Sequence, residues 1–369
     1  MNSSTGFRGT ILYGFYFKLY IRFAQLLKTI LLTTTEIQEL KGRFSKSLKA
    51  VIIPHKNPDG DAIGSCLALY HYLKQYQCEL AVIAPNEFPD FLKWMPGEDQ
   101  IIIHEKQLDQ AKKWIKSADM VFTLDFNSLS RVNGVAETLE HFKGDYVMID
   151  HHQAPDSYAK YTYSDTSMSS TCEMVYNFIQ MMNDGQKITQ EIATCLYTGI
   201  MTDTGSFRFP STTSATHRVV AELIDKGADN AQIHNAIYDT SSLDKLQLHG
   251  CALKNLVQLP EYNTVYITLS KEELAQHNFK KGDTEGFVNY GLSLKGIKFA
   301  LIFIESQQEE IVKISLRSKG DFSVNDFARS HFSGGGHTNA AGGRSTLSLE
   351  DTVKKFEELL PDYKDQLQS

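Results

Sequence analysis

One loop near the start of the chain carries three side chains that could bind a metal ion. In the segment 50–66 (AVIIPHKNPDGDAIGSC), an apolar run is followed by His55, Asp59 and Asp61, and then by apolar residues at helical spacing. Such a loop lies at the carboxyl end of a strand, where an open α/β sheet binds its ligand. One imidazole and two carboxylates suit Mn²⁺, Fe²⁺ or Zn²⁺ better than Ca²⁺. The loop therefore offers half of a site for two metal ions.

Each aspartate of this loop has a simpler interpretation when it is taken alone. Asp61 could be the N-cap of the following helix, and Pro58, Asp59 and Gly60 could form an ordinary turn. The metal-binding interpretation rests on the combination with His55, and it requires further ligands from elsewhere in the chain.

The elements that would position such ligands alternate between strands and helices. Short apolar runs predict buried strands, and the segments between them have helical periodicity. This alternation is typical of an α/β domain with a mostly parallel, doubly wound sheet and helices on both faces. The predicted strands are 50–53, 79–84, 101–103, 119–124 and 146–149.

Two of these strands end in further carboxylate and imidazole groups. Asp125 ends one strand, and Asp150, His151 and His152 end the next strand along the chain. Because parallel strands bring their carboxyl ends to the same edge of a sheet, we expect these side chains to converge with those of the first loop.

One more carboxylate follows a helix. The segment 189–201 predicts a buried helix, and Asp203 comes directly after it. Asp203 could join the same metal site, or it could be a loop residue that hydrogen-bonds its own backbone. The sequence leaves both interpretations open.

The pattern changes after about residue 260, where a second, smaller α/β domain is predicted. The preceding segment has helical periodicity and ends at a proline, which predicts a helical linker. We therefore expect a cleft between two domains. The predicted division is an N-terminal extension over 1–34, a catalytic metal-binding domain over 35–242, the linker over 243–260 and a substrate-binding domain over 261–369.

The second domain contains a glycine loop, in which Gly334, Gly335 and Gly336 precede His337. Consecutive glycines let backbone N–H groups approach an anion closely. The small residues behind them could open a helix whose N-terminus favours phosphate. His337 could add a side-chain donor, and Arg317 and Lys319, at the end of a predicted strand, could add positive charge. The alternative is a flexible loop without a ligand.

Composition excludes some classes of function. The chain has 369 residues, a net charge of −7 and no strongly basic block, so we expect no binding of long duplex nucleic acid. Five cysteines without a C-x-x-C pair indicate reduced thiols in a cytoplasmic protein.

The first thirty or so residues are rich in aromatic and aliphatic side chains. No apolar run there reaches the roughly 18 residues that a membrane span needs, and the charges stand in the wrong order for a signal peptide. We interpret this segment as an extension without a role in the chemistry. An amphipathic surface anchor and an extra docked helix are the alternatives.

Five segments together resemble the DHH phosphoesterase family, in its two-domain form that acts on nanoRNA and phosphoadenosine phosphate. The resemblance covers about residues 45–365, and the acidic and histidine positions of the family pattern are all present. The segments are HKNPDGD at 55–61, LDFNSLSR at 124–131, IDHH at 149–152, GIMTDTGSFRF at 199–209 and GGGHTNAAGG at 334–343.

The resemblance implies a centre for two divalent ions, most often Mn²⁺. Two such ions bind a phosphoryl oxygen and lower the pKa of a bound water from about 15.7 towards 7, which predicts in-line attack of hydroxide on a phosphate ester. The implied ligands are His55 and Asp59 for one ion, Asp61, His151 and Asp203 for the other, and Asp125 as the bridge between them.

The resemblance also implies roles for residues beside the ions. His152 would contact the substrate or act as an acid or base, and Asp150 would orient a histidine. In the second domain, Arg317, His337 and the backbone of the three glycines would hold a terminal phosphate or a nucleotide end.

The predicted substrates are short oligoribonucleotides cleaved from an end, 3′-phosphoadenosine 5′-phosphate converted to AMP, or both. A phosphodiesterase for linear or cyclic dinucleotides is the alternative on the same scaffold. Inorganic pyrophosphatase is less favoured. From another class, a non-catalytic nucleotide-binding protein is disfavoured because clustered carboxylates are costly without cations. The sequence leaves open whether the chain forms a homodimer.

Overall fold

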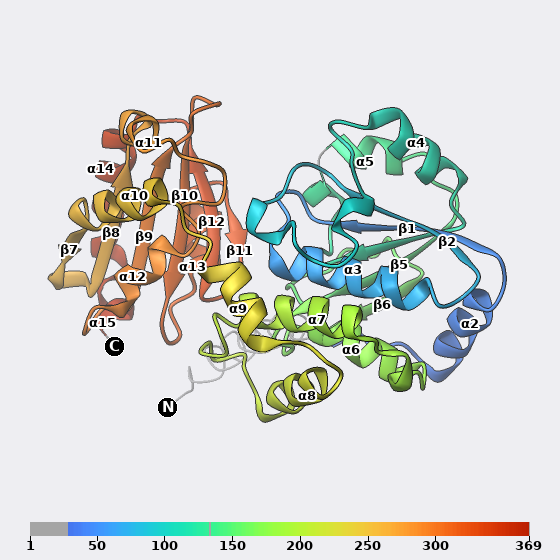
Figure 1. The fold of residues 1–369 in the computed structure, drawn as a ribbon. Helices are drawn as coiled ribbons and strands as arrows, with labels where there is room; N and C mark the ends of the chain where they lie inside the picture. The colour runs from blue at the N-terminus through green and yellow to red at the C-terminus, as the bar shows by residue number, and fades with distance from the viewer. Residues whose placement is uncertain (1–28, 133, 369) are drawn as a thin grey trace, which may run out of the picture. The chain divides into compact units, whose positions relative to one another are not determined.

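The computed structural model describes residues 29–132 and 134–368. The chain divides into two units, and the division falls between Asp239 and Thr240 (Figure 1). The first unit carries the predicted metal ligands, and the second carries the glycine loop. No helix in these described ranges is long and apolar enough to cross a membrane.

The first unit is built on a six-stranded parallel sheet with the order β3-β2-β1-β4-β5-β6. The order reverses between the neighbouring central strands β1 and β4, which makes their carboxyl ends the topological switch point where such sheets bind ligands. The strands are β1 (Leu48–Pro54), β2 (Cys78–Ala84), β3 (Ile101–Ile103), β4 (Met120–Leu124), β5 (Asp145–Asp150) and β6 (Tyr161–Ser164).

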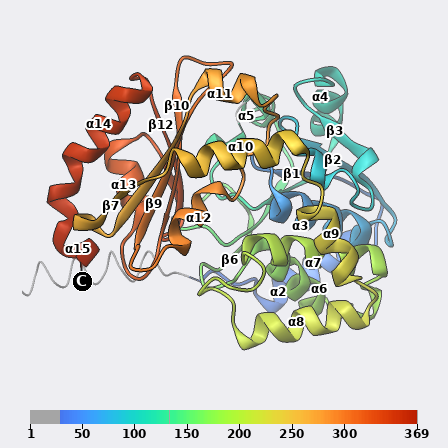
Figure 2. The ribbon, with the colours of Figure 1, turned by 60° about the vertical axis from the view of Figure 1, so that its left-hand side comes forward.

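Helices cover both faces of this sheet (Figures 1 and 2). Ala50 and Ile52 of β1 pack into one core with α3, α6 and α7, whereas Val51 and Ile53 pack into a second core with α4 and α5. The predicted doubly wound α/β fold is confirmed. The helices are α2 (Thr34–Phe44), α3 (Gly60–Leu73), α4 (Leu108–Ser117), α5 (Gly134–Leu139), α6 (Thr171–Met181), α7 (Gln190–Asp203), α8 (Ser214–Asp225) and α9 (Asn230–Tyr238).

Helices α3, α6 and α7 pack closely beneath the site. A Cβ atom at Gly199 of α7 would lie 2.1 Å from the sulfur of Cys172 and 2.9 Å from a carboxylate oxygen of Asp61. Real Cβ contacts are not that short, so glycine is required there. This close approach brings the end of α7 to the carboxylate at the start of α3.

The second unit is a smaller α/β domain around a mixed sheet, β11-β12-β10-β9-β8-β7, in which only β8 and β9 are parallel. A phenylalanine-rich core lies with α13 and α14 on one face, and a second core lies with α10 and α12 on the other (Figure 2). The elements are α10 (Leu243–Lys254), β7 (Val257–Leu259), β8 (Thr264–Leu269), α11 (Lys271–Gln276), α12 (Phe287–Ser293), β9 (Phe299–Glu305), β10 (Val312–Ser318), α13 (Val324–His331), β11 (Gly335–Gly336), β12 (Ala340–Ser345), α14 (Leu349–Leu359) and α15 (Lys364–Gln368).

Two sequence-based expectations about the second unit need correction. The segment 243–260 is not one helix, because β7 pairs with β8 along the sheet edge and α10 buries Leu248 and Ala252 within this unit. The residues after the glycines do not open a helix. They form β12, whose pairing with β10 overrides the weak strand propensity of alanine and glycine.

Most of the predicted N-terminal extension lies outside the described residues. Its last part belongs to the first unit: Ile30 pairs with Ser164 through two backbone hydrogen bonds of 2.8 and 2.9 Å, and Leu32 is buried. The side chain of Thr33 accepts a hydrogen bond from the backbone of Glu36 and so caps α2. The predicted domain boundary at residue 34 therefore lies inside the packed part of the first unit.

Candidate metal centre

The predicted ligands of the first unit come together at the carboxyl ends of β1, β4 and β5. They form three overlapping groups, and within each group one donor atom per residue lies within 4.8 Å of the others. The groups are His55, Asp59 and Asp125; Asp61, His151 and Asp203; and Asp125, Asp150 and His152.

The loop after β1 presents His55 with a defined tautomer. Its Nδ1 lies 2.7 Å from the carbonyl oxygen of Lys56, which can only accept, so Nδ1 carries the hydrogen and donates it. Nε2 faces the carboxylates, at 3.3 Å from Asp125 Oδ2 and 3.9 Å from Asp59 Oδ2, and in the neutral imidazole it is the nitrogen with the free lone pair. This arrangement matches that of a metal-binding imidazole.

Asp59, rather than Asp61, is the N-cap of α3. One oxygen, Oδ1, accepts hydrogen bonds from the backbone of Asp61 and Ala62 at 3.1 and 3.0 Å. The other oxygen, Oδ2, is the one that faces His55. Asp59 therefore combines capping with a ligand position, so the two interpretations of this residue are compatible.

Asp61 points into the protein and is 1% exposed. Its two oxygens accept backbone hydrogen bonds from Thr171 and Cys172 at 2.7 and 2.8 Å, at the start of α6. The macrodipole of α6 favours a negative charge at this end. The hydroxyl of Thr171 also donates to Asp125 Oδ1 at 3.0 Å.

Asp125 lies at the centre of the group. Its two carboxylate oxygens face different histidines: Oδ2 is 3.3 Å from His55 Nε2, and Oδ1 is 3.5 Å from His151 Nε2. Asp125 is 2% exposed, and its backbone has a φ of +64°, which is unfavourable for any residue other than glycine. The fold therefore maintains a strained backbone that presents this carboxylate between two imidazoles.

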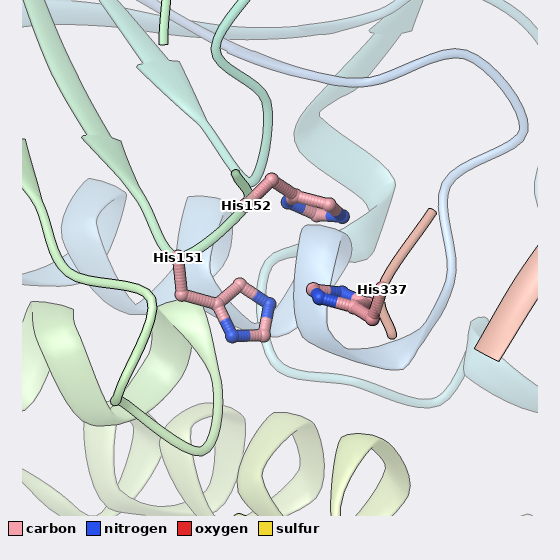
Figure 3. A group of neighbouring side chains, drawn as sticks. All are labelled: His151, His152 and His337. Carbon is pink, nitrogen blue, oxygen red and sulfur yellow. The ribbon is translucent and has the colours of Figure 1, made fainter. Parts of the chain in front are cut away.

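His151 and His152 leave the carboxyl end of β5 in succession, as Figure 3 shows. His151 Nδ1 donates to the carbonyl oxygen of Met168 at 3.2 Å. Its Nε2 then lies 3.6 Å from Asp203 Oδ2 and 3.9 Å from Asp61 Oδ2. Asp203, at the end of α7, is thus close to the other predicted ligands.

Asp150 fixes the orientation of His152. It is fully buried, and its oxygens accept hydrogen bonds from His152 Nδ1 at 2.7 Å and from the His152 backbone at 2.9 Å. Burial lowers the pKa of His152 below its ordinary value despite this carboxylate. Asn127 supports the same segment, because its side-chain amide donates to the carbonyl oxygens of His152 and Gln153.

The charges of the group are mutually dependent. Burial, together with the charges of Asp125 and Asp203, raises the pKa of Asp61 well above its ordinary value. Burial would also raise the pKa of Asp125, but the imidazoles of His151 and His55 hold it well below its usual range. Burial lowers the pKa of His55, yet the carboxylates of Asp125 and Asp59 together outweigh burial and raise that pKa to about 9.

This donor set fits divalent cations. Buried carboxylates at such short separations repel one another, and cations between them would relieve that repulsion. Imidazole nitrogens with fixed tautomers, mixed with carboxylate oxygens, suit Mn²⁺, Fe²⁺ or Zn²⁺.

Three supporting groups were not predicted from the sequence: the Thr171 hydroxyl, the Met168 carbonyl and the Asn127 amide. The only sequence signal is the run Ser169, Ser170 and Thr171 before an apolar helix, which is typical of a helix N-terminus.

The second unit places Arg317 at the end of β10 and His337 directly after β11. Three backbone N–H groups of the glycine loop already have partners there. Gly334 donates to Ala328 O at 3.2 Å, Gly336 to an Asn325 side-chain oxygen at 2.9 Å, and His337 to Ala340 O at 2.7 Å. An anion at this loop would therefore be bound mainly by side chains.

Comparison with known proteins identifies the family. Residues 49–200 match the model of the DHH family, N-terminal domain, and residues 262–368 match that of the DHHA1 domain. A Thermus thermophilus protein named bifunctional oligoribonuclease and PAP phosphatase NrnA is 33% identical over 87% of this chain and 92% of its own length. A Bacillus subtilis protein of the same name is 29% identical over 80% of this chain and 90% of its own length.

A solved structure is also similar. The crystal structure of an exopolyphosphatase-related protein from Bacteroides fragilis is 40% identical, with a TM-score of 0.88, and the match covers 93% of this chain and all of that one. The resemblance stated from the sequence motifs is thereby confirmed. This chain belongs to the DHH family of metal-dependent phosphoesterases, in the form that combines a DHH domain with a DHHA1 domain.

Proposed function

We propose that this protein hydrolyses short oligoribonucleotides from one end and converts 3′-phosphoadenosine 5′-phosphate to AMP, with Mn²⁺ as its cofactor. The observation that carries the proposal is the position of Asp125, whose two oxygens face His55 and His151 within a set of further carboxylates. The names of the two NrnA relatives support the choice of substrates.

The residues of the first unit would divide between two cations. His55 and Asp59 would hold one, Asp61, His151 and Asp203 the other, and Asp125 both. Two divalent cations in such a site supply an activated water and stabilise negative charge on the phosphoryl oxygens.

Other residues of the chain prepare this site. The backbone N–H groups of Thr171 and Cys172 hold Asp61, and the Thr171 hydroxyl holds Asp125, so neither carboxylate needs to reorganise. Asp150 keeps hydrogen on Nδ1 of His152. The Nε2 atom of His152 is then the one that contacts the substrate or exchanges a proton with it.

The second unit would bind the end of the substrate. Arg317 and His337 are the side chains proposed for the terminal phosphate, since most backbone donors of the glycine loop are engaged within the unit. Arginine is suited to this role because its planar guanidinium matches a phosphate with two parallel hydrogen bonds.

The proposal is tested by an activity screen on the full chain after metal removal with EDTA and reloading with Mn²⁺. The substrates are a 5′-phosphorylated diadenylate, 3′-phosphoadenosine 5′-phosphate, a cyclic dinucleotide and pyrophosphate. We expect the first two to be hydrolysed, EDTA to abolish turnover and Asp125→Asn to be inactive, which excludes a contaminating nuclease. Turnover of pyrophosphate or the cyclic dinucleotide alone, or of no substrate, would contradict the proposal.

A further inference from the structure

Two of the three consecutive glycines are explained by the fold of the second unit. A Cβ atom at Gly334 would lie 2.0 Å from the carbonyl oxygen of Gly342 on β12. Gly336 has a φ of +154°, and its Cβ would lie 2.5 Å from the carbonyl oxygen of Ala340. Any side chain at either position would push β11 away from β12.

Gly335 has neither constraint. Its φ lies outside the left-handed region, and the nearest atoms to an added Cβ are Arg329 Nε and Asn325 Oδ1, both at 3.5 Å, followed by Arg329 Nη2 at 3.8 Å. These are ordinary van der Waals separations, so the fold would accept alanine. The added methyl group would instead cover the guanidinium of Arg329.

That guanidinium is held in place. Arg329 Nε donates to Asn325 Oδ1 at 3.1 Å, and the same oxygen accepts the backbone N–H of Gly336 at 2.9 Å. Asn325 is 5% exposed, so it forms a buried link between α13 and β11. Asn325 thus fixes the orientation of the exposed Arg329 side chain relative to β11.

The charge of Arg329 is not neutralised within the described ranges. No carboxylate there lies within 4.0 Å of its nitrogen atoms, and the bond from Nε to Asn325 is its one side-chain hydrogen bond among the described residues. The two Nη groups can therefore donate to a ligand. A fixed, planar guanidinium with free Nη donors is the group that binds phosphate through two parallel hydrogen bonds.

We infer that Arg329 is a phosphate-binding residue of the second unit, and that Gly335 keeps its guanidinium open to the phosphate group. The ligand is a phosphate monoester at the end of a nucleotide, and this assignment rests on the proposed function. Asn325 is a positioning residue that acts through Arg329. No sequence pattern singles out Arg329, which is the one arginine on the short amphipathic helix α13.

The test compares Arg329→Gln with a matched control, Lys354→Gln, which removes one exposed positive charge from the same unit. With Mn²⁺ and 5′-phosphorylated diadenylate, we expect Arg329→Gln to raise KM about tenfold or more, since a charge-assisted contact is lost, and to change kcat less than about twofold. Lys354→Gln should behave as the wild type. Arg329→Lys, which keeps the charge but not the planar fork, should fall between them.

A second measurement does not depend on turnover. Titration of AMP into the EDTA-treated protein should give a Kd about tenfold weaker for Arg329→Gln than for the wild type. Gly335→Ala should also weaken AMP binding while leaving Tm unchanged, whereas Gly334→Ala should lower Tm. Comparing Gly335→Ala with Gly334→Ala therefore distinguishes a loss of AMP affinity from a loss of stability.

Equal AMP affinities of the wild type and Arg329→Gln would overturn the inference, and so would a wild-type protein that does not bind AMP. A wild type that binds AMP through Arg329 but hydrolyses neither predicted substrate would contradict the proposed function and leave the phosphate site standing. The two claims can therefore fail separately.

Discussion

The hydroxyl of Thr171 donates a hydrogen bond to Asp125 at 3.0 Å, while the backbone of the same residue donates to Asp61 at 2.7 Å. The start of α6 thus holds two of the carboxylates that we propose as metal ligands. The hydroxyl should restrict Asp125 to the orientation in which its oxygens face both histidines.

Replacing Thr171 by valine tests this role. The substitution keeps the shape of the side chain and the backbone donor but removes the hydroxyl. We therefore expect the Mn²⁺ concentration that gives half-maximal activity to rise 10- to 100-fold, which is the usual effect of losing a residue that supports a metal ligand. The measurement is activity against Mn²⁺ concentration. Thr198→Val is the matched control, because that buried hydroxyl donates to a carbonyl within α7. Equal Mn²⁺ dependence of the two variants would contradict the role.

Asp150→Asn should reduce turnover without removing the metal. Both oxygens of Asp150 accept from His152, and an amide can replace only one of these acceptors, so His152 loses its orientation. We expect kcat to fall about 100-fold or more, as for loss of a proton-transfer group. Elemental analysis should find an unchanged Mn content. The exposed Asp156→Asn serves as control, and wild-type kcat in Asp150→Asn would refute the proposed orientation of His152.

Asp184 should make the first unit less stable at acidic pH. This buried carboxylate accepts hydrogen bonds from Tyr72 at 2.7 Å, from Tyr76, and from Lys41 at 3.2 Å, and these contacts lower its pKa despite burial. Because the pKa in the folded protein lies below the ordinary value of 3.8, this stabilisation is complete above that value and is lost as the pH falls through the lowered pKa.

Urea unfolding at pH 7 and at pH 3 measures this effect. At pH 7, Asp184→Asn should lower the free energy of unfolding by about 2 kcal/mol, a typical value for hydrogen bonds to a charged group. The difference from the wild type should narrow at pH 3. The exposed Asp225→Asn should have no such effect, and a difference for Asp184→Asn that is independent of pH would show that its charge is not involved.

Two truncations should separate the N-terminal segment from the first unit. Removing residues 1–28 should leave turnover and stability unchanged. Removing residues 1–33 also takes away the pairing of Ile30, the buried Leu32 and the Thr33 cap, so we expect a loss of about 3 kcal/mol in stability. Urea unfolding compares the two proteins, and equal midpoints would mean that residues 29–33 contribute nothing.

The sequence was sufficient to predict five of the six strands of the first sheet and the convergence of their carboxyl ends, but it did not predict β6. Apolar runs that end at Pro54, Leu124 and Ile149 are buried on both sides, and parallel pairing then places the following polar residues at one edge. The supports of the ligands could not be predicted. The carbonyl of Met168 and the hydroxyl of Thr171 lie near them only after α6 packs against α3.

The glycine loop shows another limit of local patterns. Consecutive glycines are typical of a backbone that binds an anion, but they also let two strands approach closely. At Gly334 and Gly336 the second reason holds, since pairing with β12 leaves no room for a Cβ atom. This distinction depends on atoms of Gly342 and Ala340 across the strand pair, so spacing in the sequence cannot make it.

We propose that six side chains of the first unit hold two cations, with Asp125 between them. An anomalous difference map from crystals grown with Mn²⁺ would locate these ions. We expect two peaks in the first unit, one beside His55 and Asp59 and the other beside Asp61, His151 and Asp203, with Asp125 touching both. A single peak, or peaks that Asp125 does not contact, would contradict this proposal.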